Sequence, residues 1–211
     1  DKKEALKIVK NDGEELKNLP AHFKKNKEIV LEAVKQWDYA LAYADESLKK
    51  DRKFILELEA VKQNGHALRY ANESLKKDRK FILEAVKQNG HALEYADESL
   101  KKDKEIVLEA VKQNGYALYY ADDSIKKDRK FILEAVKKDG LALNYADDSL
   151  KKDREIVLEA VKDKKNEEHY GQDAYALEYA DESLKKDKEI VLEAVKQLGL
   201  ALQHADKSLK K

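Results

Sequence analysis

The sequence predicts an all-α fold, an α-solenoid of short antiparallel helix pairs in eight units of about 25 residues. Three observations predict it. One motif recurs along nearly the whole chain, for example DRKFILEAVKQNGHALEYADESLKK at 78–102. Apolar residues return twice in each copy at the spacing of an amphipathic helix. A repeat of this length cannot bury its apolar faces alone, so neighbouring copies stack and each one packs mainly on the next.

The repeat also sets the organisation of the chain. We expect a divergent N-terminal capping repeat at 1–25, because Glu14 and Glu15 replace the usual aromatic–alanine pair and Pro20 limits helix continuation. Seven tandem repeats follow it in one continuous array. Their bounds are 26–50, 51–77, 78–102, 103–127, 128–152, 153–186 and 187–211.

The first element of each repeat is a predicted helix of about ten residues. In the 78–102 repeat, four apolar side chains fall on one helical face: Phe81, Ile82, Ala85 and Val86. Asp78 precedes this run and is a good N-cap, because its carboxylate accepts hydrogen bonds from the first free amides. Asn89 and Gly90 end the helix, and we expect the glycine to adopt the left-handed conformation that commonly follows a helix.

A second helix of similar length is predicted to follow. Leu93, Ala96 and Leu100 form its apolar stripe, and Asp103 caps the first helix of the next repeat. Asp97 favours the start of a turn, so a break near Ala96, giving two and a half short helices per repeat, stays open. Helices this short are marginal in water, so each one must bury its stripe against a neighbouring unit.

A family resemblance rests on the repeated pattern D-[KR]-[EK]-[IF]-[VI]-L-E-A-V-K-Q-N-G-x-A-L-x-Y-A, followed by an acidic residue and a Ser-Leu-Lys-Lys turn. The pattern resembles tandem repeats of bacteria and protists that are grouped as domain of unknown function 4116, a domain spanning about two of these units. The similarity covers nearly the whole chain, including VKNDG at 9–13 and Leu19-Pro20 in the first unit. The resemblance implies this repeat type and no activity, because the family has no established catalytic residues to carry over.

Composition excludes several classes of partner. The 43 Lys and Arg residues balance 43 Asp and Glu residues, whereas nucleic-acid binding usually needs a net basic face. The same balance argues against electrostatic membrane binding, and no apolar run reaches the roughly 20 residues of a membrane-spanning helix. There is no cysteine, and no secretory signal is visible. We therefore expect a soluble, intracellular chain without nucleic-acid partner, membrane insertion or small-molecule cofactor.

No motif for catalysis or metal binding appears in the sequence. There is no G-x-S-x-G, P-loop or dinucleotide fingerprint, and no nucleophile with a positioned base. The five histidines do not have the spacing of a zinc site, and acidic pairs such as Asp97-Glu98 lack the glycine and spacing of a calcium loop. We expect no catalytic residue and no metal, and hence no enzyme.

Positions that vary between otherwise constant repeats are the candidates for binding specificity. The place after the glycine holds chemically different side chains: Tyr39, His66, His91, Tyr116, Leu141, Tyr175 and Leu200. Three residues further on, Tyr119 lies one helical turn away on the same face. This spacing predicts an aromatic-lined binding strip. The alternative is a half-buried contact between units. A nearly invariant tyrosine, such as Tyr95, adjoins the strip and is expected to pack with its hydroxyl at the surface.

Two interruptions break the repeat. The first inserts two residues at 57–59, which rotates the apolar stripe by about 200°, so the helix must bulge, kink or start earlier. The second, at 163–173, lengthens a connection and adds His169 and Tyr170 as candidate binding residues. A tolerated loop is the alternative there, since added loop length costs little stability.

The sequence therefore predicts a non-enzymatic helical-repeat scaffold, interaction protein or structural protein. Two alternatives stay open: a structural protein that assembles head to tail, and an accessory repeat region of a larger enzyme or effector. The expected partner is a protein, or a second copy bound through the C-terminal end, because Leu198 and Leu200 add apolar surface to the last repeat.

Overall fold

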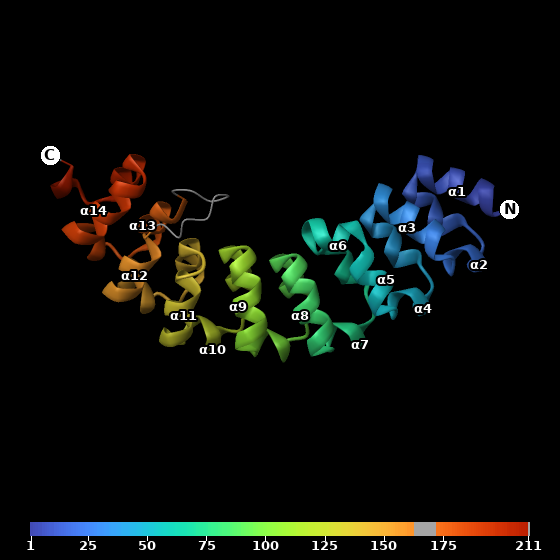
Figure 1. The fold of residues 1–211 in the computed structure, drawn as a ribbon, viewed down its shortest axis with the longest axis horizontal. Helices are drawn as coiled ribbons and strands as arrows, with labels where there is room; N and C mark the ends of the chain where they lie inside the picture. The colour runs from blue at the N-terminus through green and yellow to red at the C-terminus, as the bar shows by residue number, and fades with distance from the viewer. Residues whose placement is uncertain (163–171, 211) are drawn as a thin grey trace. The chain divides into compact units, whose positions relative to one another are not determined.

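The computed structural model describes residues 1–162 and 172–210 (Figure 1). In these residues every regular element is helical, which confirms the all-α repeat fold. The chain forms two compact units, Asp1–Leu100 and Lys101–Lys211, and repeats pack side by side within each unit. In the second unit, for example, successive repeats bring together α9 (Lys104–Gln113), α11 (Arg129–Val136) and α12 (Arg154–Ala160) (Figure 1).

Each repeat opens with an α-helix, as predicted. Besides the three helices just named, this set comprises α1 (Lys2–Asn11), α3 (Lys27–Gln36), α8 (Arg79–Gln88) and α14 (Lys188–Gln197). In the 51–77 repeat the helix is divided into α5 (Arg52–Glu57) and α6 (Glu59–Asn64). Leu58, between them, has an extended backbone (φ −62°, ψ 127°) and is fully buried. The two extra residues are thus accommodated by a break in the helix, a more complete interruption than the predicted bulge, kink or earlier start.

The second segment of each repeat is a 3-10 helix rather than the predicted α-helix. These segments are η1 (Gly13–Asn18), η2 (Asp38–Tyr43), η3 (His66–Tyr70), η4 (Gly90–Tyr95), η6 (Gly115–Tyr120), η7 (Gly140–Tyr145), η9 (Gln172–Tyr175), which α13 (Ala176–Tyr179) continues, and η11 (Gly199–His204). A single turn then closes each repeat. These turns are α2 (Ala21–Lys24), α4 (Glu46–Lys49), α7 (Glu73–Lys76), η5 (Leu100–Lys102), α10 (Asp123–Lys126), η8 (Leu150–Lys152), η10 (Leu184–Lys186) and η12 (Lys207–Leu209).

The predicted second helix is broken near Ala96, as the alternative of two and a half short helices per repeat predicted. Ala96 has an extended backbone (φ −67°, ψ 150°). Oδ1 of Asp97 then accepts hydrogen bonds from the Ser99 amide at 3.1 Å and the Ser99 hydroxyl at 2.6 Å. A short side chain that satisfies the amides of the next turn competes with helix continuation. Two and a half short helices per repeat are therefore observed, not one continuous pair.

The start of the first helix matches the sequence prediction, and its end does not. Oδ1 of Asp78 accepts from the amide of Phe81 at 3.0 Å, as an N-cap should. At the other end Asn89 is extended (φ −155°, ψ 121°). Among the glycines in the described part of the chain, the left-handed conformation occurs at Gly65 (φ 74°) and at no other. The expectation of a left-handed Gly90 is therefore wrong.

Close approach between repeats explains the glycines instead. A Cβ atom added to Gly140 would lie 2.0 Å from the carbonyl oxygen of Ala160 in the next repeat, and one added to Gly13 would lie 2.3 Å from that of Ala33. These separations are far below van der Waals contact. Glycine is needed at these two places because the backbone of the next repeat touches it, not because the backbone dihedrals require it.

Apolar packing and one recurrent backbone hydrogen bond hold the repeats in register. The predicted faces are buried, including Phe81, Val86 and Leu93, each with no exposed surface. From the second repeat on, an N–H at the start of the closing turn donates to a lysine carbonyl oxygen of the preceding repeat over 2.9–3.1 Å. The pairs are Asp45–Lys24, Asn72–Lys49, Asp97–Lys76, Asp122–Lys101, Asp147–Lys126, Asp181–Lys151 and Asp206–Lys185. The same register therefore recurs at successive interfaces within each unit.

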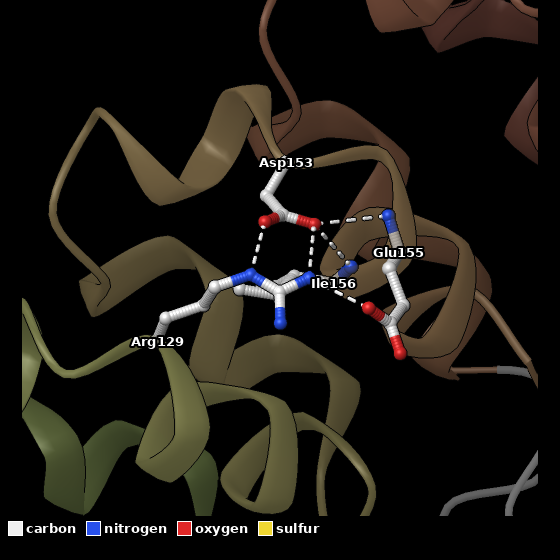
Figure 2. Close-up of polar contacts among 4 residues, drawn as sticks. All are labelled: Arg129, Asp153, Glu155 and Ile156. Carbon is white, nitrogen blue, oxygen red and sulfur yellow. Dashed lines mark hydrogen bonds and ion pairs between the residues drawn. The ribbon is translucent and has the colours of Figure 1, made fainter.

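Ion pairs link the first residue of one helix to the N-cap of the next repeat. Figure 2 shows Arg129, whose Nε donates to Oδ2 of Asp153 at 2.7 Å and whose Nη2 donates to Oε2 of Glu155 at 2.6 Å. Asp153 also accepts from the amides of Glu155 at 3.0 Å and Ile156 at 3.2 Å. Equivalent pairs are Lys27–Asp51, Arg52–Asp78, Lys104–Asp128 and Arg154–Asp187. One carboxylate thus caps its own helix and joins two repeats.

Acid is expected to destabilise the fold through these carboxylates. A hydrogen bond from Lys27 lowers the pKa of Asp51, and one from Lys104 lowers the pKa of Asp128. The Ser47 hydroxyl does the same to the pKa of Asp45. These pKa values lie below the unfolded value of 3.8. The carboxylates therefore contribute their full stabilisation at pH values above 3.8 and lose it as the pH falls through their folded pKa values.

Denaturant melts across pH should show this dependence. The free energy of unfolding is expected to stay level between about pH 7 and 5 and then to fall progressively toward about pH 2. Asp128→Asn, which keeps an N-cap but cannot titrate, should flatten the acid limb relative to the wild type. A free energy of unfolding that rises on acidification below about pH 4 would contradict the assignment.

Candidate functional site

The predicted strip lies at the contacts between repeats. The residue after the glycine packs against the conserved tyrosine place of the next repeat: Tyr39 against Tyr70, His66 against Tyr95, Tyr116 against Tyr145, and Tyr175 against His204. Ring centroids in these pairs are 5.2–6.2 Å apart. Tyr116 and Tyr175 are half-buried in these contacts, as the alternative interpretation of a contact between neighbouring repeats predicted.

Exposure separates the candidates from one another. Tyr39 is 45% exposed and Tyr119 is 55% exposed, and both are large apolar surfaces for a folded chain. His66 is also exposed, whereas His91 is half-buried and its backbone N–H donates to Oδ1 of Asn89 at 2.9 Å. The predicted candidates His169 and Tyr170 lie outside the described residues. The strip is thus reduced to aromatic surface around Tyr39 in the first unit and around Tyr119 in the second.

Trp37 organises the surface in the first unit. Its ring stacks on Tyr39 (centroids 5.5 Å apart, planes 15° apart) and on Tyr43 (6.2 Å, 28°). Tyr39 in turn contacts Tyr70 at 5.3 Å. We call Trp37, Tyr39, Tyr43 and Tyr70 the N-terminal aromatic patch. Sequence reasoning missed Trp37, although a signal was available: Trp37-Asp38 stands where the regular repeats have Asn-Gly or Asp-Gly.

A guanidinium group borders this patch. Arg69 is exposed; its Nη1 donates to the Tyr39 hydroxyl at 3.4 Å, and its Cζ lies 5.8 Å from the centroid of the Tyr95 ring. Burial raises the pKa of Tyr95 to about 12, with a further contribution from Glu94. The Tyr95 hydroxyl is therefore protonated at neutral pH and remains a hydrogen-bond donor. Arg69 holds the place in its repeat that Tyr119 holds in another, but it is not among the predicted candidates.

The second unit carries a closed cluster of four tyrosines: Tyr116, Tyr119, Tyr120 and Tyr145. Tyr116 contacts each of the others at 5.2–5.6 Å. Most of the ring pairs are edge-to-face, with interplanar angles of 76–85°, so the rings occupy one another's faces. Nζ of Lys126 lies 5.7 Å from the centroid of the Tyr119 ring. We call these four residues the tyrosine cluster.

The two outer faces of the array differ in polarity. On the last repeat Leu192, Leu200 and Leu202 are 55%, 63% and 38% exposed. Leucines at the place of Leu202 in earlier repeats have no exposed surface: Leu118, Leu143 and Leu177. On the first repeat the exposed Glu4 occupies the place that the buried Phe81 holds in α8. The last repeat thus presents apolar surface, and the first presents charge.

The side chains gathered in these places are suited to binding. Phenol rings, indole and guanidinium supply flat apolar faces and hydrogen-bond donors. Among the residues that the structure describes, no three His, Asp or Glu side chains converge in a way that could hold a metal ion. No helix of the described chain is long and apolar enough to cross a membrane.

Comparison with known proteins identifies the repeat. The family model described as domain of unknown function (DUF4116) matches six stretches in tandem: 1–49, 36–76, 51–101, 78–126, 128–167 and 168–210. Most matches span about two repeats. No curated protein sequence and no solved structure matches the chain. Because the matches together cover almost every residue, the chain belongs to the DUF4116 family and consists of its repeats in tandem.

Proposed function

We propose that this chain is a non-enzymatic helical-repeat scaffold that binds a protein partner through exposed aromatic side chains. The observation that carries the proposal is the exposure of Tyr39 and Tyr119 beside apolar stripes that are buried in the regular repeats. Tyrosine, tryptophan and arginine are the side chains most enriched at the energetic centres of protein interfaces. All three types meet in the N-terminal aromatic patch and the neighbouring Arg69.

Self-assembly through the C-terminal face is the second candidate, favoured by the exposed Leu192, Leu200 and Leu202. Head-to-tail docking would place these leucines against the outer face of a first repeat. That face carries Glu4 and Lys7, both exposed, and burying unpaired charges is costly. The scaffold is therefore the better-supported function.

Panning of a random peptide library on the immobilised chain tests the scaffold. Enriched peptides are expected to bind the Tyr39→Ser, Tyr119→Ser double variant at least about tenfold more weakly than the wild type, because both exposed rings are removed. The matched control is Lys80→Ser, Lys130→Ser, two exposed lysines outside the aromatic surfaces, and it should bind normally. Enriched peptides that bind the double variant as tightly as the wild type would contradict the proposal.

Light scattering over a concentration series separates the two candidates. A chain that remains monomeric, with or without Leu200→Lys, agrees with the scaffold. Concentration-dependent association that Leu200→Lys abolishes, and that the Tyr39 and Tyr119 changes leave intact, would favour self-assembly instead.

A further inference from the structure

The N-terminal aromatic patch has the geometry of a platform rather than a pocket. The Trp37 ring stacks on those of Tyr39 and Tyr43, so the three rings form one continuous aromatic surface. Tyr39 and Tyr43 are 45% and 39% exposed. In the tyrosine cluster one ring is exposed, Tyr119 at 55%, and the other three are half-buried. The N-terminal patch therefore offers two exposed rings that share contacts with Trp37.

Few modes of peptide recognition fit such a platform. Strand addition needs an exposed sheet edge, and the described residues contain no strand. An amphipathic helix lays its apolar face into a hydrophobic groove, whereas an aromatic lining is characteristic of polyproline II recognition. A polyproline II segment fits well, because its prolines pack on aromatic faces. Its helix repeats every three residues, or about 9 Å, and it is already ordered before binding. A ligand that is already ordered loses little conformational entropy on binding, which matters because a shallow surface yields little binding energy.

The charge of Arg69 favours those polyproline II segments that carry acidic side chains. Arg69 is exposed beside Tyr39 and Tyr95 and forms no ion pair with any residue of the described ranges 1–162 and 172–210. A guanidinium group offers five N–H donors, and the hydroxyls of Tyr39, Tyr70 and Tyr95 share some of them. A ligand carboxylate would be its natural partner through charge-assisted hydrogen bonds. Glu94 acts on the same Tyr95 hydroxyl as Arg69, so it is a nearby negative charge that the ligand must compete with.

We propose that the N-terminal aromatic patch and Arg69 bind an extended, proline-rich peptide segment that carries carboxylates. Prolines lie against the rings of Trp37, Tyr39 and Tyr43, and an acidic side chain pairs with Arg69. The proposal rests on the proposed scaffold function and names the chemistry of its partner.

Trp37 makes the proposal directly measurable, because it is the one tryptophan of the chain and lies within the patch. Its fluorescence is followed while the full chain is titrated with a synthetic peptide of repeated Pro-Pro-Asp. A saturable change in emission is expected. Matched peptides of repeated Pro-Pro-Lys and Gly-Gly-Asp, which lose the charge or the prolines, should bind at least about tenfold more weakly.

Variants assign the contacts. Arg69→Gln should weaken binding of the Pro-Pro-Asp peptide about tenfold and leave the weak Pro-Pro-Lys binding unchanged. Glu94→Gln should tighten the acidic peptide, because it removes a competing charge. Lys130→Ser, an exposed lysine outside the aromatic surfaces, is the matched control and should bind within about twofold of the wild type. Circular dichroism of each variant verifies that the helices are retained.

The result distinguishes this proposal from the broader one. Equal binding of the three peptides, no saturable response to any of them, or no effect of Arg69→Gln in a folded variant would overturn the acidic proline-rich partner. The scaffold function would still stand if panning enriches other peptides that require Tyr39 and Tyr119. If no enriched peptide requires those side chains, both proposals fail together.

Discussion

Leu143→Ala is expected to lower the free energy of unfolding by about 2–5 kcal/mol, the usual cost of removing a buried leucine side chain. Leu143 has no exposed surface and lies on the predicted apolar stripe of η7. Truncation leaves a cavity that the close-packed neighbouring repeats cannot fill completely. Urea denaturation followed by circular dichroism measures the change.

Leu202→Ala is the matched control for this prediction. Leu202 holds the same place in the last repeat, but 38% of it is exposed. Its truncation should cost about 1 kcal/mol, because part of the side chain is already in water. Equal transition midpoints for the two variants would show that Leu143 is not a packing residue. A broader transition for Leu143→Ala, with a lower denaturant slope, would mean that the repeats unfold separately.

The first helix of each repeat could be predicted because its signals are local. The apolar residues Phe81, Ile82, Ala85 and Val86 recur at helical spacing, and all four are buried. Asp78 stands directly before the run and caps the helix in the structure. The apolar spacing and the capping residue both lie within one repeat, so they predict the helix without reference to the repeat that it packs against.

The rest of the fold depends on neighbouring repeats, which local patterns do not describe. The sequence near Asn89 and Gly90 has the composition of a helix ending in a left-handed glycine, yet Asn89 is extended and the glycine is not left-handed. The break after Tyr95 was identified only as an alternative, because Asp97 can either continue a helix or cap a turn. Contacts across the interface decide between such options.

The sequence predicted where the candidate site lies, but not which of its side chains are exposed or that Trp37 belongs to it. Variation between repeats indicated the place of Tyr39, Tyr116 and Tyr119, and the structure brings these rings to the contacts between repeats. Which ring is exposed depends on the following repeat, so the sequence alone ranked Tyr116 with Tyr119. Trp37 was overlooked because it replaces a residue of the helix end rather than one of the variable face.

Gly140→Ala is expected to destabilise the second unit by about 3 kcal/mol or more. The added Cβ would lie 2.0 Å from the Ala160 carbonyl oxygen and 2.7 Å from Oδ1 of Asp173. The first atom belongs to the backbone of α12 and cannot rotate away. The second is part of a carboxylate that is 8% exposed and accepts the Gly140 N–H at 2.6 Å. Relieving the clash separates two repeats and weakens this buried hydrogen bond.

Gly199→Ala provides a control of opposite sign. Gly199 holds the same place in the last repeat, with no atom within 4 Å of its added Cβ and no left-handed backbone. Alanine there should stabilise the chain by about 0.4–1 kcal/mol, because it reduces the conformational freedom of the unfolded state. Asp38 and Ala174 show that two repeats accept a side chain at this place, so the clash belongs to particular interfaces and not to the place itself. Two glycine variants with the same effect on urea denaturation would refute the close approach of repeats as the reason for glycine. Opposite effects would establish that a neighbouring repeat, rather than the local backbone, selects this residue.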